Sequence, residues 1–364
     1  MWSLLRVCAV LALGFIALNS YAADVAIKKL YKSKWLQLET ENFIVLTDAK
    51  EKQAKDMALE LEHFRHFTAF LLGYEQHPLN QKVPVILAKN RSSFKSMGFF
   101  DNLAGIFVQN HGYVIFARAD GFKSSAQGKG NWGRAVVLHE LMHLLVNNSS
   151  LEFARPFWYN EGIAEYFGTY LEKDGHVILG DMSVLGDRFY TMLTRNGGGF
   201  EGIDSESLLK TRQADLEFHE KMNNQQSREY SKFYARSAAV VHYLNSDPAR
   251  RQQLYRYLAL IDKGHSVDDS FAYIFEMSYA EFDKNVADYI FGKYVLARTF
   301  PIGPGGIEFP ETSYTVRKVP QRESMETLFG KIMMLPRNIV SDEDRENMYQ
   351  DLEKIYPDFF AQKE

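Results

Sequence analysis

The sequence predicts an α+β fold, with a mixed-sheet lobe first and a mainly helical lobe after it. Segments in which apolar residues alternate, as in strands, all precede residue 118. Later segments repeat their apolar residues at helical spacing. Apolar residues make up 46% of the chain and aromatic residues 14%, which indicates a packed globule rather than a disordered chain.

The first residues are typical of a secretory signal peptide. Arg6 precedes an apolar run from Val7 to Leu18, and small residues follow at Ala22 and Ala23. We expect cleavage after Ala22, which leaves an exported protein, periplasmic or secreted, in a bacterium. An uncleaved membrane anchor is the alternative, although the run is too short for a spanning helix. No later segment predicts a membrane span.

The net charge and the cysteine content argue against nucleic-acid binding and against disulfide bonds. The formal net charge is −4, and loss of residues 1–22 makes it one unit more negative, because Arg6 is the charged residue there. A mildly acidic chain without a concentrated basic face argues against nucleic-acid binding. The single cysteine, Cys8, lies in the predicted signal peptide, so the mature chain uses no disulfide.

Before residue 132, the expected elements are strands around one long helix. The helix spans residues 49–72, and a Gly/Ser/Lys-rich segment at 120–131 predicts a flexible connection or a lid. Asn110-His111-Gly112 predicts a hairpin turn. The expected strands are 34–40, 42–47, 83–88, 104–109 and 113–117.

After residue 131 the chain is expected to be mainly helical. The Pro/Gly-rich segment 301–306 is the best boundary. We therefore expect one domain at 23–298, whose sheet lobe ends near residue 150, and a linker with a helical tail at 299–364. The tail could bind a protein partner. The expected helices are 132–146, 183–194, 205–210, 229–245, 248–263, 267–276, 279–296, 322–335 and 341–355.

The segment His139-Glu140-Leu141-Met142-His143 carries the strongest chemical signal. Two histidines four residues apart face the same way on a helix and can share one metal ion, with Glu140 leaning toward a water on that metal. Chance matches to HExxH are common, but this one lies in an apolar helical stretch, where histidines need partners. The alternative is a core helix whose histidines bond to their neighbours.

A second helix start, residues 155–167, supplies carboxylates. Glu161 and Glu165 lie four residues apart and therefore on one face. The link from Asn147 to Phe153 is short enough for this helix to fold back on the first. We expect Glu161 to be the third metal ligand and Glu165 to accept a hydrogen bond from a ligating histidine. The alternative is a pair of solvated glutamates.

These two segments together resemble the gluzincin zinc metallopeptidases, and among them the peptidase MA-like proteins. The resemblance covers residues 30–250, with its specific motifs at 139–167 and, less firmly, at 230–244. It implies a zincin-like fold and one zinc ion (Zn²⁺) held by His139, His143 and Glu161, with Glu140 as general base and Glu165 orienting a histidine. The Gly-x-Met-Glu-Asn motif of the related aminopeptidases is absent from the sequence, which favours an endopeptidase acting on a peptide or protein.

Two further assignments follow from the resemblance. Tyr234, in a stretch similar to the family's Tyr-x-x-Ser segment, is the expected donor to a developing oxyanion, with His219 and His242 as alternatives. Packing is the other role open to Tyr234, since the chain has 20 tyrosines. In zincins the edge strand before the active-site helix holds an extended peptide. We expect Tyr113, Val114 and Ile115 to bind substrate in this way, or to form an ordinary strand.

Two function classes remain. The first is a zinc peptidase that hydrolyses peptide bonds with Glu140 as general base. The second is a zincin-fold protein with weak or no hydrolysis that keeps the metal site for structure or for binding a partner. The intact Glu140 favours the enzyme, because a site without catalysis has no use for an acid that ligates nothing.

Overall fold

The fold is known from a computed structural model, in which the chain forms two compact units. Unit 1 comprises Met1–Arg65, Pro78–Ser124 and Pro310–Glu364, and unit 2 comprises His66–His77 and Ser125–Phe309. The predicted signal peptide and most of the predicted loop at 120–131 lie outside the described residues. The structure describes residues 25–73, 81–99, 105–109, 112–121, 132–149, 155–185, 195–196, 199–200, 203–212, 215, 224–292, 295–337 and 339–360.

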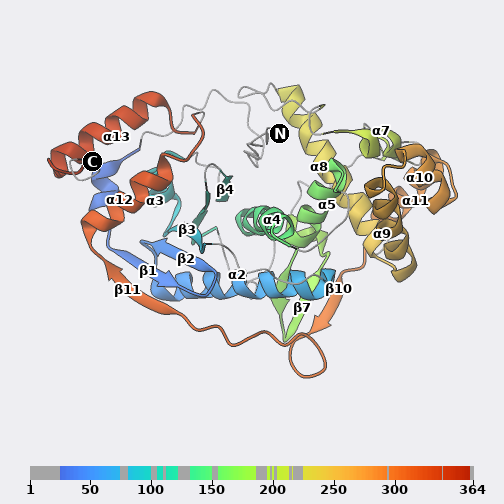
Figure 1. The fold of residues 1–364 in the computed structure, drawn as a ribbon, viewed down its shortest axis with the longest axis horizontal. Helices are drawn as coiled ribbons and strands as arrows, with labels where there is room; N and C mark the ends of the chain where they lie inside the picture. The colour runs from blue at the N-terminus through green and yellow to red at the C-terminus, as the bar shows by residue number, and fades with distance from the viewer. Residues whose placement is uncertain are drawn as a thin grey trace. The chain divides into compact units, whose positions relative to one another are not determined.

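Unit 1 is built on a six-stranded mixed sheet (Figure 1). Its strands are β1 (Trp35–Glu39), β2 (Phe43–Thr47), β3 (Val83–Ala88), β4 (Gly105–Gln109), β5 (Tyr113–Arg118) and β11 (Thr315–Val319). The order is β11-β1-β2-β3-β5-β4, in which β2, β3 and β5 run parallel and the other pairings are antiparallel. The parallel centre is almost entirely apolar, as expected for strands covered on both faces.

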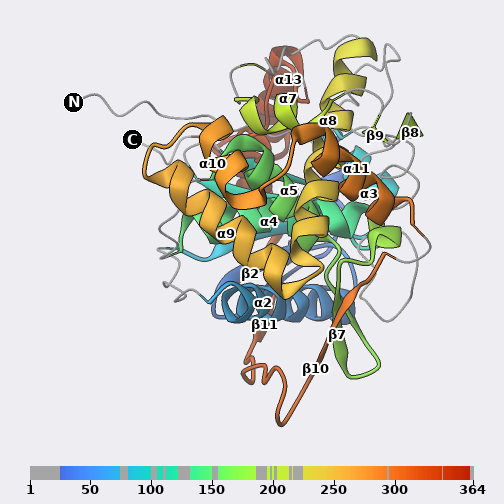
Figure 2. The same cartoon turned by 90° about the vertical axis from the view of Figure 1, so that its right-hand side faces the viewer.

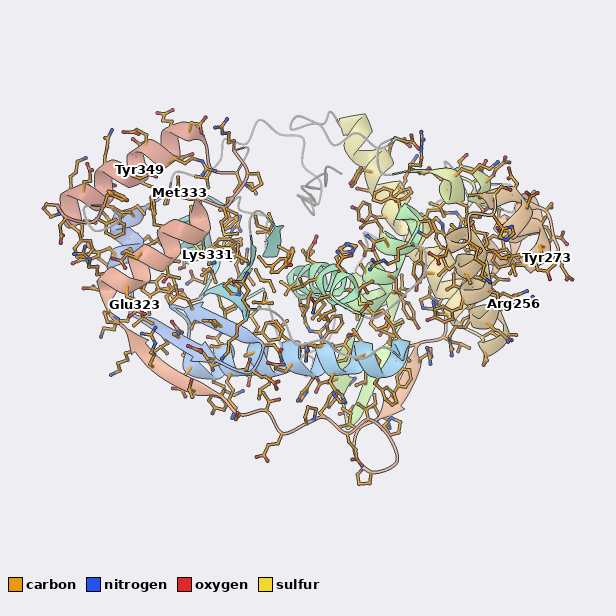
Figure 3. The ribbon with its side chains drawn as sticks, viewed as in Figure 1. Arg256, Tyr273, Glu323, Lys331, Met333 and Tyr349 are labelled. Carbon is orange, nitrogen blue, oxygen red and sulfur yellow. The ribbon has the colours of Figure 1, made fainter. Side chains whose placement is uncertain are left out.

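Five helices accompany this sheet: α1 (Ile27–Tyr31), α2 (Glu51–Leu72), α3 (Arg91–Lys95), α12 (Gln321–Ile332) and α13 (Asp342–Ile355). The boundary between the units falls within α2. Helix α13 begins at a capping box, in which Ser341 and Asp344 bond to each other's backbone amides. Its Tyr349, labelled in Figure 3, packs edge-to-face on Phe329 of α12, with ring centroids 4.9 Å apart.

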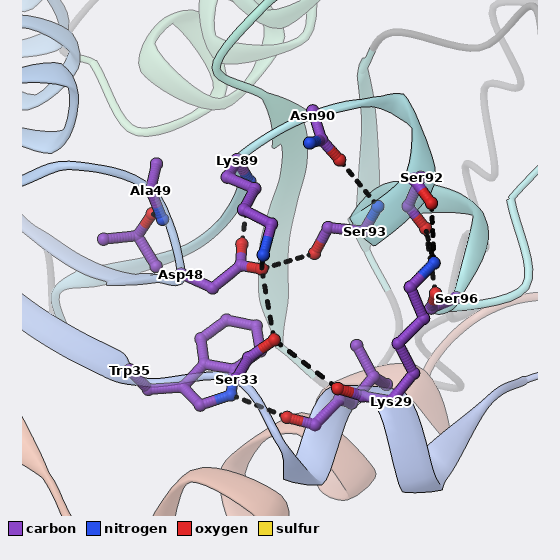
Figure 4. A network of polar contacts seen from close by, with 12 residues as sticks. Lys29, Ser33, Trp35, Asp48, Ala49, Lys89, Asn90, Ser92, Ser93 and Ser96 are labelled. Atoms are coloured by element: carbon purple, nitrogen blue, oxygen red, sulfur yellow. Dashed lines mark hydrogen bonds and ion pairs between the residues drawn. The ribbon is translucent and has the colours of Figure 1, made fainter.

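A buried carboxylate fastens the carboxyl ends of two parallel strands (Figure 4). Asp48 follows β2, and it accepts hydrogen bonds from the backbone N–H of Lys89, which follows β3, at 2.7 Å and from the Ser93 hydroxyl at 2.7 Å. The ammonium of Lys89 lies 3.5 Å from the same carboxylate. Because both oxygens of Asp48 have partners, this cluster explains local structure and does not indicate a ligand site.

Unit 2 is mainly helical and carries small antiparallel sheets (Figure 2). Its helices are α4 (Trp132–Asn147), α5 (Phe157–Gly168), the 3-10 turn η2 (Met182–Leu185), α7 (Ser205–Lys210), α8 (Asn224–Asn245), α9 (Pro248–Asp262), α10 (Val267–Phe275) and α11 (Tyr279–Ile290). Its strands are β6 (Leu171–Lys173), β7 (His176–Leu179), β8 (Arg195–Asn196), β9 (Gly199–Phe200) and β10 (Arg298–Pro301). Figure 2 shows β7 beside β10, with which it pairs.

A buried ion pair joins three helices of unit 2. Arg236 of α8 and Asp283 of α11 form this pair, and Arg236 also donates to the hydroxyl of Ser205, the first residue of α7, at 2.8 Å. Ser205 donates in turn to Asp283 at 2.6 Å. A buried pair with further hydrogen bonds is costly to break, so α8 is held firmly against its neighbours.

The predicted α+β class is confirmed, and several helix boundaries differ from the prediction. Helix α4 lies in unit 2, and residues 299–364 contribute to β10 in unit 2 and supply β11 to the sheet of unit 1. The helix predicted at 279–296 ends at Ile290, and of the one predicted at 183–194 the structure describes only the short turn η2. In the described part of the chain, no helix is long and apolar enough to cross a membrane.

Candidate metal centre

Helix α4 places two histidines side by side in the interior of unit 2. Apart from His139, Glu140 and His143, every residue from Ala135 to Val146 is apolar and buried. This apolar surface holds the helix in the interior of unit 2. His139 is 6% exposed, and its Nε2 lies 3.1 Å from Nε2 of His143, one turn later. Two imidazole nitrogens at this distance share either a proton or a cation.

Helix α5 brings a carboxylate to the same point. Oε2 of Glu161 lies 3.3 Å from Nε2 of His139 and 3.3 Å from Nε2 of His143. Gly168 allows α5 to lie this close to α4, because a Cβ at this position would be 3.1 Å from the carbonyl oxygen of Ala135. The predicted third ligand is therefore brought together with the two histidines.

The cluster fits a metal ion. For tetrahedral zinc with bonds of about 2.05 Å, neighbouring ligand atoms lie about 3.3 Å apart, close to the three distances found here. Oε2 of Glu161 is buried and has no hydrogen-bond partner. Among the described residues, no lysine or arginine lies within ion-pair distance of Glu140, Glu161 or Glu165. His139, His143 and Glu161 could thus hold a metal ion, which would supply the missing positive charge.

The two buried glutamates of this cluster have pKa values shifted in opposite directions. Burial raises the pKa of Glu161, but His139 and His143 outweigh burial and hold the pKa at about 2. Burial raises the pKa of Glu140 to about 8, and the charges of Glu161 and Glu165 add to this effect, while His143 opposes it. Glu161 is thus the permanent anion of the cluster, and Glu140 the carboxyl that can exchange a proton near neutral pH.

Glu165 lies where the sequence predicted it. Its Oε1 is 3.5 Å from Nδ1 of His139, on the side of the ring away from Glu161. A proton held on Nδ1 by this carboxylate leaves the Nε2 lone pair free for a metal.

Tyr234 of α8 lies beside this cluster. Its ring centroid is 6.0 Å from that of His139, and its hydroxyl donates to the hydroxyl of Tyr230 at 3.4 Å. Burial raises the pKa of Tyr234 well above its usual value, and the charges of Glu161 and Glu140 raise it further. Tyr234 therefore keeps its proton, which it donates to Tyr230 in this structure, and its expected role as a donor to a developing oxyanion stays a prediction.

Gly162 is a residue of this site for which the sequence analysis assigned no role. A Cβ at Gly162 would lie 2.6 Å from the carbonyl oxygen of Ser237, so the glycine lets α8 cross α5 at close range. Ser237 is one turn beyond Tyr234, and the crossing therefore sets the position of the tyrosine. The sequence contains a signal for this close approach, because Gly162 directly follows the predicted metal ligand Glu161, and a glycine at such a position indicates that another backbone lies close to it.

The other predicted site residues lie elsewhere. In its neutral form His242 has both ring nitrogens engaged: Nε2 donates to the carbonyl oxygen of Gly180 at 2.7 Å, and Nδ1 accepts from the hydroxyl of Tyr289 at 2.9 Å. Burial lowers the pKa of His242, so packing and hydrogen bonding explain this residue without an oxyanion role. His219 lies outside the described residues.

The predicted substrate strand is corrected by the sheet topology. Tyr113, Val114 and Ile115 lie in β5, which pairs with β3 on one side and with β4 on the other. A strand with both edges bonded cannot add a peptide strand, and Val114 and Ile115 are fully buried in the core of unit 1. The strand at that end of the sheet is β4.

Comparison with known proteins adds no assignment. No protein-family model matches the chain, and no significantly similar protein was found among curated sequences. The case for a function therefore depends on the residues and geometry of this chain.

Proposed function

We propose that the protein is a zinc-dependent peptidase of zincin-like fold. The observation that supports this proposal most strongly is the triangle of His139 Nε2, His143 Nε2 and Glu161 Oε2, with sides of 3.1, 3.3 and 3.3 Å. Glu140 lies next to it and is 3% exposed. Three ligands and a free carboxyl group are the parts that distinguish a catalytic zinc site from a structural one.

Zinc is the metal that the ligand set favours. Two imidazoles and one carboxylate in a buried cluster suit zinc better than calcium or magnesium, which prefer oxygen ligands. A bound zinc ion supplies a Lewis acid that polarises a carbonyl group and lowers the pKa of water to about 7.

The side chains of this chain perform the proton transfers in the proposed reaction. Oε1 of Glu140 is buried without a hydrogen-bond partner, so it is available to take a proton and to pass it to a leaving amine. The hydroxyl of Tyr234 donates a hydrogen bond to the oxygen on which negative charge develops. Glu165 holds His139 in the tautomer that leaves Nε2 free.

Glu140→Gln tests this function. The substitution keeps the size of the side chain and removes the base, so we expect one zinc per chain and a loss of at least about 1000-fold in the cleavage of fluorescence-quenched casein. The matched control is Glu281→Gln, which changes an exposed glutamate of α11 and should leave both quantities at wild-type values.

Two outcomes would contradict the proposal. Equal cleavage by the wild type and Glu140→Gln would show that Glu140 is not the base. Zinc binding without cleavage by the wild type would instead favour the non-catalytic zincin-fold protein, in which the metal serves structure or partner binding.

A further inference from the structure

Helix α8 places a second tyrosine next to Tyr234. Tyr230 lies one turn earlier on the same face of the helix, and the centroids of the two rings are 5.0 Å apart. Their hydroxyl oxygens are 3.4 Å apart, with Tyr234 as the donor in this structure. Tyr230 is half-buried, whereas Tyr234 is 6% exposed. Tyr234 is therefore the inner member of the pair, beside the candidate metal centre, and Tyr230 is the outer one.

Three neighbouring rings hold the ring of Tyr234 in place. Its centroid lies 6.0 Å from that of His139, 5.0 Å from that of Tyr230 and 6.1 Å from that of Phe233. Phe233 in turn stacks on Phe157 of α5 with centroids 4.8 Å apart, which holds this turn of α8 against α5. A ring packed in this way has little freedom to swing, but its O–H bond can still rotate about the C–O bond. The hydrogen of Tyr234 can therefore change its partner without movement of the ring.

The oxygen of Tyr234 can accept a hydrogen bond once its own hydrogen is engaged elsewhere. Among the described residues, Tyr230 is the hydrogen-bond partner of the Tyr234 hydroxyl. In the proposed reaction Tyr234 turns its hydrogen toward the developing oxyanion, which ends its donation to Tyr230. Rotation of the Tyr230 hydroxyl then reverses the bond, because a hydroxyl can both donate and accept. A hydroxyl that accepts a hydrogen bond becomes a stronger donor, so the reversed bond strengthens the contact between Tyr234 and the oxyanion.

We propose that Tyr230 is a positioning residue of the metal site, whose hydroxyl donates to Tyr234 while Tyr234 donates to the developing oxyanion. This inference rests on the proposed peptidase function and adds a residue to it. No proton passes between the two tyrosines, since both stay phenols and only the direction of their hydrogen bond changes. Tyr230 acts through Tyr234 alone, which distinguishes it from a residue that contacts the substrate.

A double-mutant cycle of Tyr230→Phe and Tyr234→Phe tests this role. Tyr230→Phe keeps the ring and should lower kcat about 3- to 10-fold with KM unchanged, because one neutral hydrogen bond is lost. Tyr234→Phe should lower kcat about 100-fold. The double variant should match Tyr234→Phe within about twofold, because Tyr230 has nothing to act on once the Tyr234 hydroxyl is absent. Steady-state kinetics with a fluorescence-quenched peptide that the wild type cleaves gives these values.

The matched control is Tyr273→Phe. Tyr273 of α10, labelled in Figure 3, is 66% exposed, and its replacement should leave kcat and KM at wild-type values. Nuclear magnetic resonance of the metal-free chain, with carbon-13 at Cζ of tyrosine, tests the hydrogen bond without any activity. The Tyr234 resonance, assigned by its loss in Tyr234→Phe, should shift in Tyr230→Phe and stay in place in Tyr273→Phe.

The possible failures of this inference can be told apart from failure of the proposed function. In a wild type that cleaves the peptide, an unchanged kcat in Tyr230→Phe would reject the role of Tyr230 and leave the function standing. Losses that multiply in the double variant would show that Tyr230 acts independently of Tyr234. An unmoved Tyr234 resonance in Tyr230→Phe would show that the hydrogen bond is not formed. A wild type without cleavage would overturn the proposed function and this inference with it.

Discussion

Two buried polar clusters of unit 2 differ in whether their charges are paired within the chain. Glu161 and Glu165 point to the histidines of α4, with no arginine or lysine among the described residues within ion-pair distance. Arg236 and Asp283, by contrast, form a buried ion pair, and Ser205 is hydrogen-bonded to both. We call the first cluster, formed by His139, His143, Glu161 and Glu165, the metal face.

This difference shows how buried charge can indicate the class of ligand. A folded chain normally pairs a buried charge with an opposite one, because an unpaired charge is costly. The metal face has excess carboxylate and two imidazole nitrogens, so the missing partner is a cation. The cluster of Arg236 and Asp283 contains one charge of each sign, so it needs no ligand.

After Glu140→Gln, the largest effect is expected at the metal face from Tyr234→Phe. Loss of the hydroxyl removes one hydrogen bond to the developing oxyanion, so kcat should fall about 100-fold while zinc content stays constant. Steady-state kinetics with a fluorescence-quenched peptide that the wild type cleaves measures this change. Tyr230→Phe is the matched control: it removes the hydroxyl that accepts the hydrogen bond of Tyr234, leaves the Tyr234 hydroxyl in place, and should cost less. An unchanged kcat in Tyr234→Phe would assign the residue to packing.

Glu165→Ala should weaken zinc binding about 10- to 100-fold, because His139 loses the carboxylate at its Nδ1. Glu165→Gln should lose less, since the amide oxygen still accepts a hydrogen bond. Competition with a chromogenic chelator measures the zinc affinity of both variants. A zinc affinity equal to that of the wild type in both variants would contradict this role of Glu165.

Gly162→Ala tests the close crossing of α5 and α8 beside the metal face. The added methyl group would meet the backbone carbonyl of Ser237, which no rotamer change can relieve, so unfolding should become easier by about 1–3 kcal/mol. Gly330→Ala is the matched control, because this helical glycine of α12 has open space around it and should gain up to about 1 kcal/mol. Urea unfolding compares the two variants, and equal changes would argue against a tight crossing.

The smallest effect concerns pH and His242, whose ring lies edge-on against Tyr166 with centroids 5.4 Å apart. Burial lowers the folded-state pKa of His242, so below about pH 6.5 the unfolded chain takes up a proton that the folded chain resists. Stability should therefore fall as the pH drops from 7 toward 5. His242→Gln should reduce this slope, while His265→Gln, at an exposed histidine, should keep it. Urea unfolding at several pH values gives the slopes, and equal slopes in all three proteins would contradict the assignment.

The metal face could be predicted from the sequence because its ligands lie on two consecutive helices. The spacing of His139 and His143 brings them together on any helix, and a short link returns Glu161 to them. The hairpin of β6 and β7 also had a local signal, which the prediction of a mainly helical lobe did not use. Its turn is Asp174-Gly175, and both residues have positive φ angles, of 50° and 73°.

Other parts of the fold had no local signal. Strand β11 pairs with β1 although its residues are mostly polar and exposed, so its hydrophobic pattern is weak. The same limit applies to β5: a hydrophobic run predicts a strand, but its place inside the sheet depends on the partners that long-range folding supplies.

The most direct test of the metal face is the zinc content of the purified chain, measured by native mass spectrometry for the wild type, Glu161→Ala and the exposed-site control Glu281→Gln. We predict one zinc per chain in the wild type and in Glu281→Gln, and none in Glu161→Ala, because only Glu161→Ala removes a ligand atom. A wild type that binds no zinc even when zinc is supplied, or a Glu161→Ala variant that keeps it at full affinity, would contradict this account.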